Sequence, residues 1–557
     1  GDAIVNRLSY QQARHYNRAA NGIYVANPGY LLSKAAIPRG AVIVEMDGKT
    51  VHDLDDFEAA LNELADGERA QARYVTMENP QNSVVRLLEM DRVWFPARRC
   101  ARDDAEGFWP CRELAAGPPP AAPAVGSTQL TRYSDPVARA IAPSLVVVTF
   151  DLPYTLSSVS DRHYYGTGLI VDKKRGYVLV DRNTVPLAIG DVTITFAGSL
   201  EVKGKIEQLH PLHNLAIVSY DPSSIGTTPV EQAEFTDETL APGDDVWVVG
   251  IKSDHQLLHQ KSTVASVDPL LLPLSRTLRF RDSNIEGITL VNAPNEIDGV
   301  IVNRKGQVAA TWSSFVVQTG GDSSQVNRGI SSDLVGQFVE TVKEGRPFYS
   351  LEAEFVYSPL FAARKMGVDE DWIAKLEKNN PLRRRALVIT RIVAGTDAAS
   401  KLRNGDMVMA IDGKVVTSYR ELEEVTQKPE VVVTVWRTDS VLEIPIETAA
   451  LDGGGIDRAI SWAGALLQDP HRAMAAKRGV EPYGVYVAYF SYGSPSTRYG
   501  LWAGRRVVEV NETPTRNLQA FIDAVKELGH RDSVRLKSVT WNGTSEVITL
   551  KLDTQYW

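Results

Sequence analysis

The chain has 557 residues, too many for a single hydrophobic core, so several domains are expected. With 43% hydrophobic and 23% charged residues, its composition is that of a soluble globular protein and excludes a disordered or fibrous one. A net charge of -9 without long runs of Lys or Arg argues against nucleic-acid binding, and no apolar run approaches the roughly 18 residues of a membrane span. Peptides or proteins are therefore the expected partners.

In chain order, the first pattern is an apolar strand, a turn, a second strand ending in Asp or Asn, and a leucine-bearing helix. This pattern recurs, which predicts an internal repeat of similar modules. The pair Asp412-Gly413 suits it, because Asp-Gly tolerates the positive φ of a tight turn between strands. The strand, strand and helix segments are 22–26, 39–49 and 54–57 in the first copy, 386–390, 404–414 and 419–422 in the second, and 484–488, 503–511 and 517–521 in the third.

These copies resemble PDZ domains, small α+β modules that bind an extended peptide by adding it as a strand to their own sheet. The resemblance implies binding of unfolded proteins or peptide C-termini, and the second copy has the clearest candidate groove. The family's Gly-rich turn for a peptide carboxylate is not clear in any copy, so packing of the modules against their neighbours is an alternative. The candidate peptide-binding residues are Leu387, Val388 and Ile389 in the second copy and Val485, Tyr486 and Val487 in the third.

Two cysteines, Cys100 and Cys111, follow the first copy. They are close enough in sequence to close a small disulfide loop in an oxidising compartment. The reduced state is favoured, because a larger exported protein needs no such bridge, and the disulfide is the alternative. A metal site would need further ligands, and no His lies nearby.

A proline-rich stretch after the cysteines is typical of an extended linker. Beyond it, many short β-rich runs with Gly and Pro at their turns predict an all-β double barrel. The predicted fold class is therefore mainly β and multidomain. The predicted domains are a PDZ-like domain with an extension at 1–113, a linker at 114–128, a barrel domain at 129–345, a PDZ domain at 346–451 and a PDZ-like domain at 456–557.

The barrel domain contains three sequence motifs, which we call landmark runs, and their order along the chain is informative. The first, 165–183, reads YGTGLIVDKKRGYVLVDRN; the second, 210–218, reads HPLHNLAIV; and the third, 292–306, reads NAPNEIDGVIVNRKG. In this order they resemble the HtrA/Deg branch of the trypsin-like serine proteases. That family uses a His–Asp–Ser triad, in which the imidazole takes the serine proton and the aspartate orients it.

The resemblance places Asn183 at the position of the triad His, Asn214 at that of the Asp and Ile297 at that of the Ser. We call these positions the triad slots. An amide nitrogen has no basic lone pair near neutral pH, so Asn183 cannot take a proton from a nucleophile. The resemblance therefore implies a degenerate protease domain, a pseudoprotease, with no catalytic residue of the family in place.

The neighbourhood of the third slot agrees with that interpretation. No serine occurs between Ser283 and Ser313, so no shift of register restores a nucleophile. Glu296 or Asp298 would also place a carboxylate where backbone donors should receive an oxyanion, and a carboxylate there would destabilise that charge.

Other chemistry has weaker signals. His210 and His213 form an H-x-x-H pair that could ligate zinc, but no third ligand follows at metal-like spacing, so a loop entering a strand is favoured. His163 is interpreted as a packed surface residue. No phosphate-binding loop or dinucleotide fingerprint occurs, and no metal or cofactor is expected.

The order PDZ, inactive protease, PDZ, PDZ is similar to the C-terminal half of the double-length HtrA-like proteases of fungi and plants, in which an active protease half comes first. The more specific runs are 8–14 (LSYQQAR), 181–185 (DRNTV), 210–214 (HPLHN) and 492–501 (YGSPSTRYGL). The resemblance implies an ATP-independent serine endopeptidase of protein quality control, located in the chloroplast of plants or the nucleus of fungi. An exported or periplasmic location is the alternative.

The leading hypothesis is a non-catalytic half that binds peptides through its PDZ modules and mediates assembly, either as a homo-oligomer or with an active protease half. A protease with a noncanonical active site is one alternative. A chaperone-like holdase, in which the inactive cleft binds apolar segments without cutting them, is another.

Overall fold

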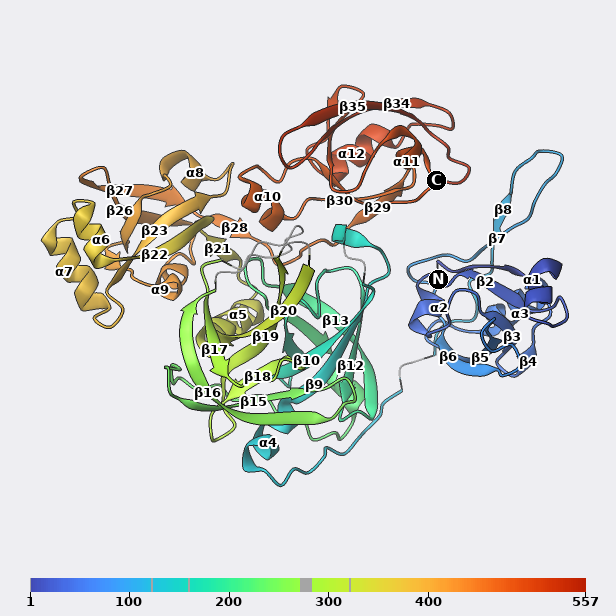
Figure 1. Cartoon of the computed structure of the whole chain (residues 1–557), viewed down its shortest axis with the longest axis horizontal. Helices are drawn as coiled ribbons and strands as arrows, with labels where there is room; N and C mark the ends of the chain where they lie inside the picture. The colour runs from blue at the N-terminus through green and yellow to red at the C-terminus, as the bar shows by residue number, and fades with distance from the viewer. Residues whose placement is uncertain (1, 122–123, 159–160, 271–282, 320–321) are drawn as a thin grey trace. The chain divides into compact units, whose positions relative to one another are not determined.

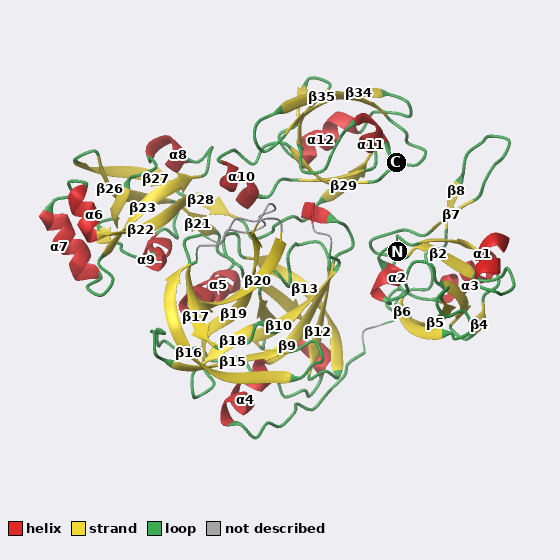
Figure 2. Ribbon diagram, viewed as in Figure 1, coloured by secondary structure: helices red, strands yellow, loops and turns green. Residues whose placement is uncertain are grey.

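The computed structural model describes residues 2–121, 124–158, 161–270, 283–319 and 322–557. The chain forms two compact units, Gly1–Ala124 and Val125–Trp557, and strands dominate both (Figures 1 and 2). Among the helices of these residues, none combines the length and the apolarity needed to cross a bilayer. Residues 122–123 of the predicted linker lie outside the described residues.

The first unit contains the first module, an antiparallel sheet with strand order β1-β2-β3-β5-β6 and the short β4 beside β3. Helix α3 covers this sheet, since its Phe57 and Ala60 are buried in one core with Ile23 and Met46 of the strands. Strand β1 pairs with β2 at the edge of the sheet. The elements are β1 (Ile4–Arg7), α1 (Tyr10–His15), β2 (Ile23–Asn27), α2 (Leu31–Lys34), β3 (Val42–Met46), β4 (Lys49–Thr50), α3 (Leu54–Glu63), β5 (Arg69–Val75) and β6 (Val84–Glu89).

A hairpin of β7 (Arg98–Cys100) and β8 (Cys111–Glu113) follows this sheet. Its register places Cys100 opposite Cys111, and the two form a disulfide in place of the reduced state favoured from sequence. Directly opposed residues of a strand pair have Cβ atoms only about 5 Å apart, a proximity that sequence separation alone does not reveal. Arg112 Nη2 also lies 2.7 Å from both carboxylate oxygens of Glu58 on α3, so the hairpin is tied to the module.

The second unit begins with a closed barrel of strand order β10-β11-β14-β13-β12-β9. Its strands alternate as the barrel requires; along β12, for example, Val192, Ile194 and Phe196 are buried while the residues between them are partly exposed. The elements are α4 (Pro136–Ile141), η1 (Ala142–Ser144), β9 (Leu145–Asp151), η2 (Leu156–Ser158), β10 (His163–Asp172), β11 (Tyr177–Val180), β12 (Asp191–Phe196), β13 (Leu200–Leu209), β14 (Ala216–Tyr220) and η3 (Pro222–Ile225).

A second closed barrel follows, with strand order β15-β16-β17-β20-β19-β18. One buried cluster joins the two barrels and helix α5, because Leu179 of the first barrel, Val300 of the second and Phe338 of the helix belong to it. The predicted double barrel is thereby confirmed. The elements are β15 (Asp245–Ile251), β16 (Leu257–Pro269), β17 (Glu286–Val291), β18 (Gly299–Val302), β19 (Val308–Thr319), β20 (Asp322–Ser331) and α5 (Ser332–Glu344).

The second module is a sheet of strand order β22-β23-β24-β26-β27, with β25 beside β24 and a separate pair of β21 and β28. Strand β22 is therefore an edge strand, while β23 lies inside the sheet. The elements are β21 (Phe348–Ser350), β22 (Ala353–Pro359), α6 (Leu360–Lys365), α7 (Glu370–Asn379), β23 (Arg385–Ile392), α8 (Asp397–Lys401), β24 (Met407–Ile411), β25 (Lys414–Val415), α9 (Tyr419–Val425), β26 (Glu430–Arg437), β27 (Ser440–Glu447) and β28 (Ala449–Leu451).

The third module has strand order β29-β30-β31-β32-β34-β35, with β33 beside β32. It differs from the second module by the additional strand β29 at its edge. The elements are β29 (Ala459–Trp462), β30 (Ala465–Gln468), α10 (Arg472–Arg478), β31 (Val485–Phe490), α11 (Pro495–Tyr499), β32 (Arg506–Val510), β33 (Thr513–Pro514), α12 (Leu518–Val525), β34 (Ser533–Val539) and β35 (Ser545–Lys551).

Local chemistry explains why the repeat recurs. In each module a turn with two residues at positive φ joins two short paired strands, and an Asp, Ser or Asn side chain then caps the following helix by accepting from its backbone N–H groups. The predicted α+β PDZ-like modules flanking a double barrel are thereby confirmed as a fold class. The turn pairs are Asp47-Gly48, Asp412-Gly413 and Asn511-Glu512, and the caps are Asp53, Ser418 and Asn517.

A buried ion pair in the second module allows a test of its stability. Asp406 is 2% exposed and accepts hydrogen bonds from Arg437 Nε at 2.7 Å and Nη2 at 2.6 Å. Because Asp406→Ala leaves the guanidinium without its counter-charge in a largely buried place, we expect this module to lose about 3 kcal/mol of unfolding free energy. Hydrogen exchange of the β24 and β26 amides in the full chain measures that loss.

The matched control is Glu512→Ala in the third module. Glu512 pairs with Arg535 at 2.7 Å, but the side chains are 76% and 48% exposed. Solvent screens such a pair, so we expect a change below about 0.5 kcal/mol. Equal losses in the two variants would contradict the assignment of stability to the buried pair.

Candidate functional site

The first two triad slots meet at the contact between the barrels. Asn183 follows β11 and Asn214 precedes β14, both in the first barrel, whereas Ser314 lies on β19 of the second. Both amides donate from Nδ2 to the backbone carbonyl of Ser314, Asn214 at 2.7 Å. The structure therefore brings Asn183 and Asn214 together on one backbone acceptor.

These amides link the barrels but offer no base. Asn214 is 1% exposed, and its Oδ1 accepts the backbone N–H of Arg182 at 2.8 Å. Asn183 also lies 3.2 Å from Ser314 Oγ through its Nδ2, which donates there as well. Since an amide nitrogen only donates, no proton can pass from the Ser314 hydroxyl to Asn183.

The third triad slot is apolar and enclosed. Ile297, just before β18, is 3% exposed and packs in a cluster with Val248, Ile301 and Trp312. Its backbone carbonyl accepts from Asn327 Nδ2 at 2.8 Å. A buried hydrocarbon side chain supplies neither a nucleophile nor a proton donor at this position.

Sequence reasoning missed Asp181, the most heavily hydrogen-bonded carboxylate at this contact. Its Oδ1 accepts the backbone N–H and the hydroxyl of Thr184, both at 2.8 Å. Its Oδ2 accepts the backbone N–H and the hydroxyl of Ser314, both at 3.1 Å. Only the position of Asp181 two residues before a triad slot could have drawn attention to it in the sequence.

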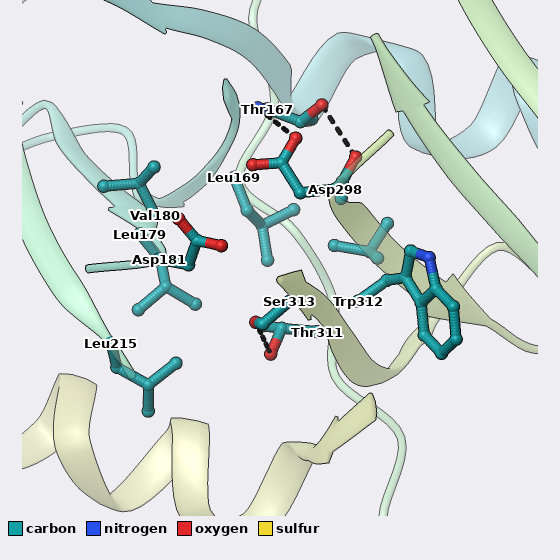
Figure 3. A pocket seen from close by; sticks show the side chains of 12 residues that line it. Thr167, Leu169, Leu179, Val180, Asp181, Leu215, Asp298, Thr311, Trp312 and Ser313 are labelled. Atoms are coloured by element: carbon teal, nitrogen blue, oxygen red, sulfur yellow. Dashed lines mark hydrogen bonds between the residues drawn. The ribbon is translucent and has the colours of Figure 1, made fainter. Parts of the chain in front are cut away.

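A second carboxylate approaches the same place from the second barrel. Asp298 Oδ1 accepts the Thr167 N–H at 3.0 Å, and its backbone carbonyl accepts the Thr167 hydroxyl at 3.0 Å. Asp298 and Asp181 line one small cavity of about 10 Å³, room for about one water molecule (Figure 3). Burial, and then the negative charge of Asp181, raise the pKa of Asp298 to about 7.

The carboxylates predicted beside the third slot thus behave differently. Glu296 is exposed, whereas Asp298 turns into the barrel contact. Asp298 is bound to the first barrel, because Thr184 Oγ1 lies 3.4 Å from its Oδ2 in addition to the two Thr167 contacts. Desolvation and the neighbouring negative charge of Asp181 account for its raised pKa.

A serine and a histidine do meet elsewhere in the second unit. The Ser157 hydroxyl of η2 contacts His471 Nε2, and the Ser157 N–H donates to Gln468 Oε1 at 2.7 Å. The two residues are 0% and 6% exposed, so both are buried among the residues that the structure describes. The contact joins the first barrel to the third module.

The H-x-x-H pair gains a third residue that its sequence did not reveal. Glu423 of α9 comes from the second module, and ligand atoms of His210, His213 and Glu423 lie within 4.8 Å of one another. The closest contact is between His213 Nε2 and the Glu423 carboxylate, at 3.0 and 3.2 Å. Long-range packing of two domains made this cluster, which no local spacing could predict.

The hydrogen bonding of the cluster favours a domain contact over a metal centre. His210 Nδ1 accepts the backbone N–H groups of Leu212 and His213, at 3.1 and 3.0 Å, so its ring proton lies on Nε2. Burial, and then the charges of His213, Arg182 and Arg420, lower the pKa of His210 well below its usual range. A neutral ring with a protonated Nε2 cannot ligate a metal through that atom without losing the proton.

The candidate peptide-binding strands lie inside their sheets. Strand β23, with Leu387, Val388 and Ile389, pairs with both β22 and β24, and β31, with Val485, Tyr486 and Val487, pairs with both β30 and β32. An added peptide needs a strand with an unpaired side, and β22 is one of the two edge strands of the second module. Sequence pattern identifies strands but not their order in the sheet, so it chose the apolar interior strands.

In the second module, side chains already occupy the open side of β22. Asn284, in the segment before β17, donates from Nδ2 to the Ala353 carbonyl at 2.7 Å and accepts the Phe355 N–H at 2.9 Å. The Tyr419 hydroxyl of α9 donates to the Phe355 carbonyl at 3.1 Å. The backbone groups that would pair with a peptide therefore have internal partners in this arrangement.

The sequence of the chain matches one family model and several known proteins. A model described as "PDZ-like domain" matches residues 1–67 and 456–531. The chain is 29% identical to "Protease Do-like 7" of Arabidopsis thaliana over 100% of its length, and 28% identical to "Pro-apoptotic serine protease nma111" of Neosartorya fischeri over 99%. It spans 63% and 55% of those proteins.

Solved structures of proteases align with part of the chain at low similarity. "HtrA-type protease AlgW with tripeptide" covers 57% of the chain and 96% of its own, at 14% identity and a TM-score of 0.41. A serine endoprotease from Yersinia pestis covers 58% of the chain and 100% of its own, at 14% identity and a TM-score of 0.37. The sequence relatives confirm the predicted resemblance to HtrA-type proteases.

The raised pKa of Asp298 gives stability a distinctive pH dependence. Because that pKa is about 7 instead of 3.8, the folded chain holds a proton that the unfolded chain has released, and stability falls as pH rises from about 4 to 7. Asp298→Asn mimics the protonated carboxyl. We expect it to stabilise the barrels at pH 8 by up to about 4 kcal/mol, at about 1.4 kcal/mol per pKa unit, and by less at pH 5.

Thermal unfolding of the full chain at pH 5 and pH 8 measures this difference. The control is Glu296→Gln, which neutralises the exposed neighbouring carboxylate and should leave the pH dependence unchanged. An Asp298→Asn chain that is equally destabilised at both pH values would show that the carboxyl is not held in its protonated form.

Proposed function

We propose that this chain, a homologue of the HtrA-type serine proteases along its whole length, is a non-catalytic peptide-binding and assembly part of such a protease. The observation that carries the proposal is the content of the triad slots. They hold two amides bound to the Ser314 carbonyl and one buried isoleucine. One relative is a protease by name and the other a serine protease, and the chain spans about half to two thirds of their length.

The magnitude of the expected defect supports a non-catalytic role. Removal of a single triad residue lowers the rate by about 10⁴-fold to 10⁶-fold in serine proteases. Here the base, its orienting acid and the nucleophile are all replaced, and the replacements are integrated in buried hydrogen bonds and packing. Proteolysis by the parent protein would then belong to residues outside this chain.

The modules provide the binding role. Peptides add to an exposed strand edge through main-chain hydrogen bonds, with side-chain pockets giving selectivity. Strand β1 of the first module is such an edge. Strand β22 of the second module would offer its edge to a peptide if the two hydrogen bonds from Asn284 were broken. Unfolded proteins or peptide C-termini are the proposed ligands, and the parent protease or a second copy of this chain is the proposed assembly partner.

One observation favours the rival proposal of a noncanonical protease. The Ser157–His471 contact is a hydroxyl–imidazole pair of the kind that activates a nucleophile. Its complete burial argues against it, because the tetrahedral intermediate of peptide hydrolysis needs space and an oxyanion site beside the hydroxyl.

Digestion of unfolded casein and labelling with a fluorophosphonate probe distinguish these proposals. We expect the purified chain to release no casein fragments and to take up no more probe than the heat-denatured chain, since it lacks an activated serine. The Ser157→Ala chain serves as the matched control. Labelling that disappears in Ser157→Ala would establish the rival site, and casein cleavage retained through further purification would refute the non-catalytic role.

Peptide binding by the second module should depend on Asn284. Asn284→Ala frees the Ala353 carbonyl and the Phe355 N–H, and two hydrogen bonds of about 0.5–1.5 kcal/mol each correspond to roughly a 5-fold to 150-fold gain in affinity for an extended peptide. Fluorescence anisotropy with labelled unfolded peptides measures affinity. Hydrogen exchange of the Phe355 amide assigns the gain to β22.

The matched control for that variant is Asn292→Ala. Asn292 also lies in a barrel turn at positive φ, 52°, but is exposed and makes no side-chain contact with β22 among the described hydrogen bonds. It should leave peptide binding unchanged. If Asn284→Ala binds peptides no better than the control, the second module is a packing domain rather than a receptor.

A further inference from the structure

The third module contains a strand where the second has an open edge. Strand β29 pairs with β30 along its whole length, from Ala459 opposite Gln468 to Trp462 opposite Ala465. The two strands are joined by Ala463 and Gly464, at φ values of 50° and 78°, a turn that suits the twist of a tight hairpin. Figure 1 shows β29 and β30 at the border of the module.

Strand β29 contacts helix α12 in addition to pairing with β30. Arg458, the residue before the strand, donates from Nη2 to Gln519 Oε1 of α12 at 3.0 Å. At its end the Trp462 ring meets Phe521 of α12 edge-on, with the ring centres 5.2 Å apart. The strand therefore lies between β30 and α12, the position in which a PDZ domain holds an added peptide.

The side chains of β29 alternate between the module's core and solvent, as those of a bound peptide strand would. Successive residues of a strand point to opposite faces, so Ile460 and Trp462 share one face, and both pack against the core of the module. Ser461, between them, is exposed. The helix side therefore receives a basic, a β-branched and an aromatic side chain at alternate positions, and Phe521, 0% exposed, forms the floor for the aromatic one.

We propose that the groove between β30 and α12 is a peptide-binding site whose occupant in this chain is its own strand β29. Its ligand class is an extended segment with Arg, a β-branched residue and an aromatic residue at alternate positions. This inference rests on the proposed role of the modules as peptide receptors, and it assigns to the third one an internal ligand and a preference for an aromatic side chain.

The tether explains why such a site stays closed to other peptides. A segment joined to its site by a short turn is present at an effective concentration of about 1 mM or more. A free peptide of similar sequence at micromolar concentration is then outcompeted, even when its intrinsic contacts are the same. Weakening β29 without changing β30 or α12 should open the site.

A labelled peptide with the sequence of residues 457–463 (DRAISWA) tests this prediction in the full chain. We expect it to bind Trp462→Ala at least about tenfold more tightly than the unmodified chain, because that substitution removes the Phe521 contact of the internal strand and the peptide restores it. The same peptide with Ala in place of Trp should bind neither chain. Trp502→Ala, which removes an aromatic residue that contacts Phe490, is the matched control.

Equal binding to Trp462→Ala and to Trp502→Ala would overturn the proposal. A second measurement needs no substitution and remains informative if Trp462→Ala fails to fold. In the unmodified chain, excess peptide should speed hydrogen exchange of the β29 amides while those of β31 stay protected. Exchange of β29 and β31 together, only on unfolding of the module, would show that β29 is a permanent part of the sheet.

These outcomes are separate from those of the proposed function. A closed third module is compatible with peptide binding by the first two modules, and failure of the peptide to bind leaves the casein and probe results unaffected. Conversely, proteolysis by the chain would refute the non-catalytic role without changing where β29 lies.

Discussion

The contact between the two barrels depends on a simple constraint: polar groups removed from water must find partners. Asp181 meets it by accepting from Thr184 on its own barrel and from Ser314 on the other. Asn183 and Asn214 meet it by donating to the Ser314 carbonyl. Residues at two triad slots therefore contribute to holding the barrels together, and their amide chemistry suits that task better than a proton transfer.

A related constraint governs the modules, because an unpaired strand edge exposes backbone donors and acceptors that invite other chains. The second and third modules satisfy their edges differently. In the second, Asn284 and Tyr419 side chains bind the groups of Ala353 and Phe355. In the third, a complete strand does so. A side-chain cap leaves more of the groove unfilled than a strand, so the two modules differ in how readily an incoming peptide could compete.

Much of this could be predicted from the sequence because it depends on local chemistry. Turn pairs such as Asp412-Gly413 and caps such as Ser418 encode strand–turn–strand–helix units directly, and the β-rich runs between them predict the barrels. What depends on packing between distant segments could not be predicted. Three features arise from pairings that leave no local signal in the sequence. They are the order of β22 and β23, the approach of Glu423 to His213, and the position of Asp298 beside Asp181.

The disulfide between Cys100 and Cys111 makes the covalent state of the first unit depend on the redox conditions of the compartment in which the protein is made. Both cysteines are exposed on a short hairpin, so the bond is open to reduction by small thiols, and cytosolic glutathione keeps such pairs reduced. In the reduced form the Arg112–Glu58 contact would still connect the hairpin to α3, but a two-stranded hairpin alone is only marginally stable. Material produced in a reducing host and in an oxidising one would therefore share the fold of the first unit but differ in its susceptibility to proteolysis at this hairpin.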